Sequence, residues 1–95
     1  MSRILVASPE GAVVRRHGRL AAPPATLPGK RVAVLVNGKP NAGLLLSAVA
    51  EDLADRTGMR LSPVLGKRSA AEPADAEVLD NLRRSAEVVL TGSGD

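Results

Sequence analysis

A short polar loop in the middle of the chain carries the residue types best suited to hold an anionic ligand. Asn37, Gly38 and Asn41 offer backbone and amide donors, and Lys39 adds a positive charge between them. Such donors in front of a helix, whose amino end is partly positive, describe an anion-binding site. The same residues also fit a plain turn that leads into a helix, so both interpretations stay open.

The loop matches no nucleotide-binding motif, because the spacings GxxxxGK[ST] and GxGxxG are both missing. The 95 residues contain no Cys and a single His, so we expect no catalytic residue, no metal site and no cofactor within them. That histidine, His17, stands beside Gly18 and is typical of an exposed surface residue.

The loop lies between a strand pattern and a helix pattern. Residues 32–36, VAVLV, form a continuous apolar run typical of a strand buried on both faces. Behind the loop, apolar residues recur at helical spacing and predict a buried stripe of Leu45, Leu46, Val49 and Leu53. We expect the Asn41 side chain to cap this helix and Gly58 to end it.

Two more strands and one more helix follow. Residues 60–65 resemble a strand, but Pro63 removes a backbone donor and therefore predicts an edge position. A helix is expected from Pro73 to about Ser85, with Val78, Leu79 and Leu82 buried. Residues 88–90 are short and apolar and predict the last strand.

This order predicts an α/β fold of the flavodoxin-like half type, with a three-stranded parallel sheet in the order 2-1-3. Right-handed crossovers would place the two helices on opposite faces of the sheet. The first loop would then face the residues that follow the third strand across a crevice. The second group of candidate anion-binding or substrate-binding residues is therefore Thr91, Gly92, Ser93, Gly94 and Asp95.

The chain divides into an appendage, residues 1–29, and an α/β domain, residues 30–95. Residues 3–6 and 12–15 are β-prone runs on either side of a turn and predict a small hairpin. Residues 21–29 are rich in proline and predict an extended linker. The domain has open sheet edges, through which it could form a homo-oligomer.

Charge and composition narrow the class of partner. Residues 1–40 carry seven Lys or Arg against Glu10, a net charge of +6, whereas residues 41–95 carry six against nine acids, a net charge of −3. The basic residues are scattered, and the chain has no Phe, Tyr or Trp for base stacking, so a solvated arm is favoured over a nucleic-acid partner. No run is long and apolar enough for a signal peptide or a membrane span, so we expect a cytoplasmic protein.

Three segments, residues 35–42 (LVNGKPNA), 77–80 (EVLD) and 88–95 (VVLTGSGD), together resemble the UGSC family. In that family a strand ends in D-N-S-K-P-N-A, and a later strand ends in G-D directly before a selenocysteine or cysteine followed by Gly-Ser-Cys. Lys39, Pro40 and Asn41 match this pattern, whereas Val36 and Gly38 replace the usual Asp and Ser.

The resemblance implies selenol or thiol chemistry, redox or nucleophilic, at a position directly after Asp95. We expect the 95 residues to be the amino-terminal portion of such a protein, read only as far as a selenocysteine codon, and to be inactive by themselves. The alternative is an intact small module that binds an unidentified small anion or another protein.

Overall fold

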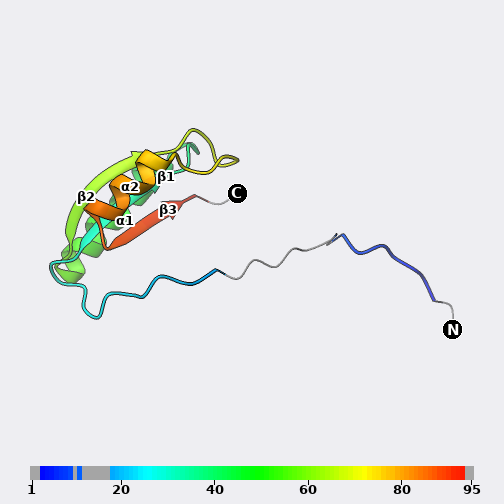
Figure 1. Cartoon of the computed structure of the whole chain (residues 1–95), viewed down its shortest axis with the longest axis horizontal. Helices are drawn as coiled ribbons and strands as arrows, with labels where there is room; N and C mark the ends of the chain where they lie inside the picture. Colours follow the sequence, from blue (N-terminus) through cyan, green and yellow to red (C-terminus); the bar gives the residue numbers. More distant parts are fainter. Residues whose placement is uncertain (1–2, 10, 12–17, 94–95) are drawn as a thin grey trace.

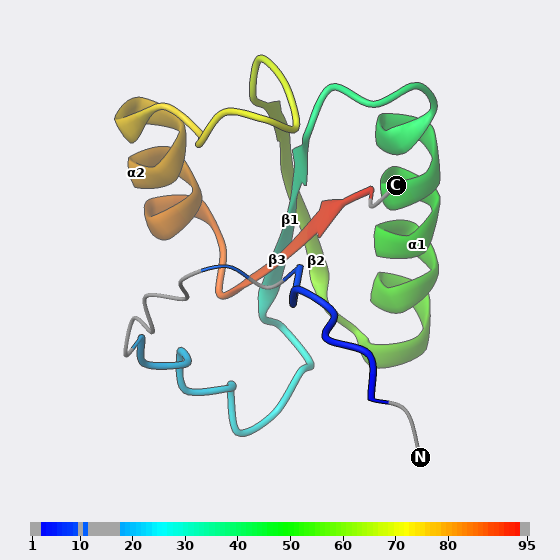
Figure 2. The ribbon, with the colours of Figure 1, turned by 90° about the vertical axis from the view of Figure 1, so that its right-hand side faces the viewer.

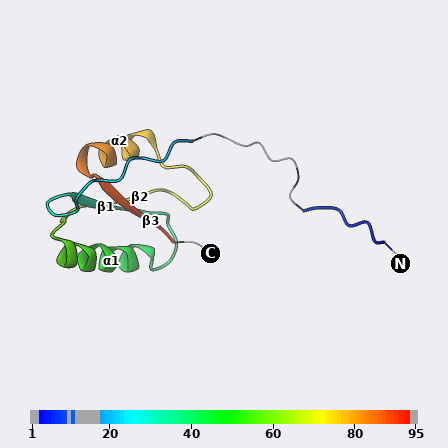
Figure 3. The same cartoon turned by 90° about the horizontal axis from the view of Figure 1, so that it is seen from below.

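The computed structural model describes residues 3–9, 11 and 18–93. Within these residues the chain forms β1 (Arg31–Val36), α1 (Ala42–Thr57), β2 (Arg60–Gly66), α2 (Ala76–Ser85) and β3 (Val88–Gly92). The strands are parallel and lie in the order β2-β1-β3 (Figure 1). The helices cover opposite faces of the sheet, α1 on one side and α2 on the other (Figures 2 and 3). The predicted α/β architecture and strand order are confirmed.

The core is small and aliphatic. Val32, Val34, Ala50 and Met59 form its buried cluster. Val32 and Val34 lie on the central strand and are completely covered, by α1 on one face and by the neighbouring strands on both sides. Alanine at the α1 contact lets the helix axis come close to the sheet, which compensates in part for the missing aromatic rings.

The buried stripe of α1 differs from the predicted one. Leu46, Ala50 and Leu53 pack on the sheet, whereas Leu45 is 57% exposed and Val49 is 44% exposed. At 3.6 residues per turn, positions 46, 50 and 53 lie on one face and positions 45 and 49 on its flank. The helix therefore leaves an apolar flank at the surface.

The connection into α2 also differs from the prediction. The helix begins at Ala76, so Pro73 lies in the preceding loop instead of the first turn. Asp75 precedes the helix in an extended conformation, and its side chain makes no capping hydrogen bond. Leu82 is buried as expected, but Leu79 is 47% exposed.

Strand β2 lies at the edge of the sheet, as Pro63 predicts. Its register with β1 shifts between Val32, which pairs with Leu61, and Val34, which pairs with Val64. Two residues of β2, one of them Pro63, thus oppose a single residue of β1, which is the geometry of a β-bulge.

The predicted amino-terminal hairpin is not apparent. Residues 3–8 form no strand, and Ile4, Leu5 and Val6 are 85%, 100% and 77% exposed. The second run of the hairpin, residues 12–15, lies outside the described residues. The linker meets the domain at Gly29, whose N–H donates to the carbonyl of Gly58 at 2.9 Å.

Arg31 and Glu87 join the amino ends of β1 and β3. The Glu87 carboxylate accepts from the Arg31 backbone N–H at 2.7 Å and from its guanidinium at 2.8 Å. The Glu87 N–H donates back to the Arg31 carbonyl at 3.0 Å. The hydrogen bonds and charge of Arg31 lower the pKa of Glu87 to about 2.

A carboxylate with a lowered pKa in the folded state stabilises the fold above its ordinary pKa. That stabilisation disappears as the pH falls from about 4.5 toward about 2. Glu87→Gln should therefore lower the free energy of unfolding at neutral pH and flatten its decline in acid. Urea unfolding at a series of pH values measures this change. Glu72→Gln, which removes an exposed carboxylate from the loop before α2, is the control. An acid decline as steep in Glu87→Gln as in the parent would contradict the prediction.

Candidate functional site

The loop between β1 and α1 begins with Asn37, whose side chain ties it to the end of β3. The residue is only 8% exposed. Its backbone N–H donates to the Gly92 carbonyl at 3.1 Å, which continues the pairing of β1 with β3. Its Nδ2 donates to the Ser93 carbonyl at 2.6 Å, and its Oδ1 accepts from the Ser93 N–H at 3.1 Å.

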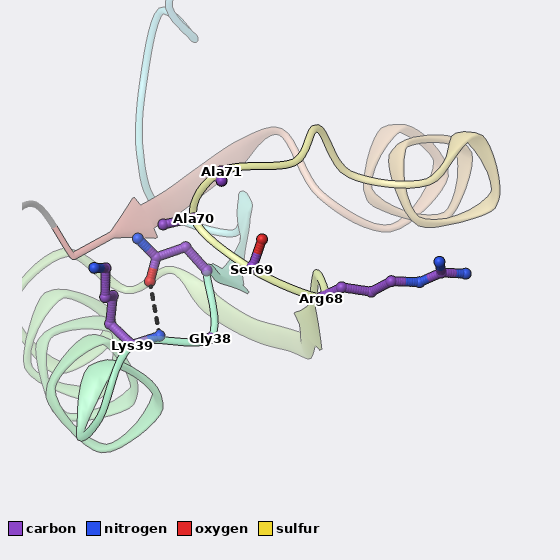
Figure 4. A pocket seen from close by; sticks show the side chains of 7 residues that line it. Gly38, Lys39, Arg68, Ser69, Ala70 and Ala71 are labelled. Atoms are coloured by element: carbon purple, nitrogen blue, oxygen red, sulfur yellow. Dashed lines mark hydrogen bonds between the residues drawn. The ribbon is translucent and has the colours of Figure 1, made fainter.

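The Asn37 Oδ1 also accepts the backbone N–H of Lys39 at 3.2 Å, drawn as the dashed line in Figure 4. A single amide thus holds two segments that lie 56 residues apart and shapes the turn that carries Lys39. The Asn37 amide, which the sequence predicts as a ligand donor, is used inside the chain. Its function in this geometry is to position the loop.

Gly38 lets the loop after β2 approach the loop after β1. Its φ is 83°, in the left-handed region that glycine adopts without strain. A Cβ atom at this position would lie 3.2 Å from the Arg68 carbonyl oxygen. The residue therefore suits both the turn and the close contact between the two loops.

The side chain of Asn41 was predicted to cap α1, but it does not. It precedes the helix in a left-handed conformation, with a φ of 63°, and its side chain makes no capping hydrogen bond. The backbone closes the turn instead, because the Ala42 N–H donates to the Lys39 carbonyl at 3.2 Å. In the left-handed conformation Asn41 lacks the extended backbone that places a capping side chain over the first turn.

A pocket of about 500 Å³ opens between the β1–α1 and β2–α2 loops. In Figure 4 the side chains of Lys39 and Arg68 point in different directions, with that of Arg68 directed away from the other labelled residues. No acidic side chain is among the described residues that line the pocket. Its lining comprises Asn37, Gly38, Lys39, Arg68, Ser69, Ala70 and Ala71.

The position of this pocket differs from the expected crevice. The sequence places a site between the loops after the first and third strands, but there Asn37 and Ser93 are in direct contact. The hollow lies on the other side of Asn37, toward the loop after β2. Residues 68–71 were not among the predicted site residues. The predicted strand order could have identified them, because β2 also neighbours β1 and the loop after β2 emerges at the same edge of the sheet.

The remaining predicted site residues lie at the end of β3. Thr91 donates its hydroxyl to the Leu35 carbonyl at 2.9 Å and so reinforces the pairing of β1 with β3. Gly92 and Ser93 meet Asn37, as described above. Gly94 and Asp95 lie outside the described residues. No cluster of three or more potential metal ligands occurs in the described part of the chain, and neither of its helices is long and apolar enough to cross a lipid bilayer.

Asn37→Asp tests the positioning role of the amide. The substitution keeps the acceptor for Ser93 and Lys39 but replaces the Nδ2 donor with an oxygen that faces the Ser93 carbonyl. We expect a loss of about 2 kcal/mol in the free energy of unfolding at neutral pH. Burial raises the pKa of such a carboxyl, and the protonated acid can donate again. The deficit relative to the parent should therefore shrink at about pH 3.5.

Urea unfolding of both proteins at the two pH values measures the effect. Asn41→Asp adds the same charge at an exposed position without a capping bond, and it should show no such deficit. An equal deficit in the two variants would contradict the positioning role.

The comparisons with known proteins place the chain in a family. A model of the UGSC family matches residues 5–95. Searches of curated proteins and of solved structures found no match. The family match covers nearly the whole chain, including the loop, the pocket and the end of β3. The chain therefore belongs to the UGSC family.

Proposed function

We propose that the pocket beside Lys39 binds a small anion. The observation that carries this proposal is a hollow at the edge of the sheet, lined by Lys39 and by the turn at Gly38. The amino end of α1 follows this turn directly in the chain, at Ala42. The α1 helix has 16 residues and no acidic residue in its first turn, so its partial positive charge is not offset locally. A carboxylate or a phosphate is the ligand chemistry that fits these groups.

The wall opposite Lys39 favours a ligand with a small body. Ser69 supplies a hydroxyl, and Ala70 and Ala71 supply only methyl groups. The missing Cβ at Gly38 lets this wall come close to the Lys39 loop, because a Cβ there would lie 3.2 Å from the Arg68 carbonyl oxygen. A compact anion would thus meet one ammonium group, one hydroxyl and a short apolar surface.

Lys39→Ala should weaken anion binding by about 10- to 100-fold, which is the range expected for a hydrogen bond to a charged group. Titration of the labelled protein with sodium acetate and, separately, with inorganic phosphate measures binding through the amide NMR signals of Gly38, Ser69 and Ala70. Lys39→Arg should retain part of the affinity. Lys30→Ala, which removes the same charge at the opposite end of β1, is the matched control. Equal effects of the Lys39→Ala and Lys30→Ala substitutions would reduce the proposal to a nonspecific charge effect and overturn it.

A second candidate function is the selenol or thiol chemistry that the resemblance implies. The hydrogen bonds of Asn37 to Ser93 favour it, because they hold Ser93, the last described residue, beside the loop that carries Lys39. A selenolate or thiolate in that position would be stabilised by Lys39 and by the amino end of α1. The 95 residues contain no Cys, so the reactive atom would have to come from the codons that follow Asp95.

Reading those codons tests the second candidate directly. We expect a codon for selenocysteine or cysteine, followed in frame by codons for Gly-Ser-Cys. Any other sequence at these positions would remove selenol and thiol chemistry from consideration. The anion-binding proposal is independent of this result, since it depends on the pocket alone.

A further inference from the structure

A narrow apolar groove runs between α1 and the edge strand β2. Its volume is about 110 Å³, and one acidic residue, Glu51, stands among its lining. Leu61 and Val64 of β2 line it and are still 55% and 52% exposed. The remaining lining residues are Val32, Val34, Ser47, Ala50 and Ser62.

The register explains why these two side chains remain half uncovered. Leu61 pairs with Val32, and Val64 pairs with Val34, so both lie on the face of the sheet that α1 covers. Because β2 is the last strand on its side of the described sheet, no further strand shields them. A short apolar segment laid along β2 would complete this face.

The chain itself carries such a segment. Ile4, Leu5 and Val6 are consecutive, β-prone and between 77% and 100% exposed. Arg3 precedes them, which puts a positive charge next to the apolar run. The described amino-terminal residues extend away from their own α/β domain (Figures 1 and 3). Leu5 and Val6 belong to the part of the chain that matches the family model.

We infer that residues 3–6 of one copy pack into the α1–β2 groove of a second copy, in a reciprocal exchange. In an extended segment Ile4 and Val6 point to the same side, two residues apart, and fit against Leu61 and Val64. Arg3 then lies within reach of the acidic Glu51 at the groove. Pro63 removes one backbone donor from the edge, so side-chain packing rather than a complete hydrogen-bond ladder holds the segment. Exchange in both directions gives a closed two-fold dimer.

The absence of Cys in the chain allows a clean crosslinking test. Proteins carrying only Val6→Cys and only Val64→Cys are mixed and oxidised. The expected product is a covalent heterodimer of twice the 9.8 kDa chain mass. Val89→Cys replaces Val64→Cys in the matched control. Val89 is 41% exposed and pairs with Ala33, so it lies on the opposite face of the sheet and should not crosslink.

A second measurement uses light scattering of the unmodified full chain. We expect a dimer, and we expect Val64→Lys to weaken association by about tenfold or more. Since Val64 is already half exposed, this variant should keep its cooperative unfolding and its anion binding. A monomer at submillimolar concentration would overturn the exchange. A dissociation constant that Val64→Lys leaves unchanged would also overturn it, and so would crosslinking of Val6→Cys to Val89→Cys as efficient as that to Val64→Cys. In the double variant Val6→Cys/Val64→Cys, a disulfide formed only within one chain would overturn it too.

Discussion

The burial of β1 is the constraint on which the rest of this domain depends. The strand lies between two parallel neighbours and two helices, and its central residues, 32–34, are buried. Only aliphatic side chains fill that space, and each buries less surface than an aromatic ring would. The position of every loop at the carboxyl edge follows from the register of β1 with β2 and β3.

Polar contacts hold β1 to β3 at both ends. At the amino end, the Arg31 guanidinium and backbone meet the Glu87 carboxylate. At the carboxyl end, the Asn37 amide meets the N–H and C=O of Ser93. In a domain with a thin apolar core, such specific contacts define the register that hydrophobic packing alone leaves loosely determined. The contact at the carboxyl end also shapes the Lys39 loop, so fold and candidate site share a residue.

The elements that could be predicted are those in which local pattern and tertiary environment agree. The run at residues 32–36 predicts a buried strand, Pro63 predicts an edge, and Gly58 predicts the end of α1, and the structure agrees with each. The stripe of α1 was harder to assign, because Leu45 and Val49 fit the helical pattern equally well and only the narrow sheet decides which flank is covered. The predicted start of α2 was wrong because Pro73 is compatible with the first turn of a helix but does not require one.

The candidate site was predicted in part, for a similar reason. The sequence identifies the loop at Asn37 and Lys39 and its proximity to the end of β3. It does not indicate that the Asn37 amide forms hydrogen bonds with Ser93. Nor does it indicate that Gly38 allows the Arg68 carbonyl to approach the loop after β1. Both depend on contacts between residues far apart in the chain, which composition and spacing do not encode.

The bulge at Pro63 has a consequence for the behaviour of the protein at high concentration. Fibre growth by cross-β stacking needs an uninterrupted row of backbone donors and acceptors along an exposed strand. In β2 that row is broken by a residue without an N–H and by the local twist of the bulge. The strand can therefore expose apolar side chains to a partner while remaining a poor template for amyloid.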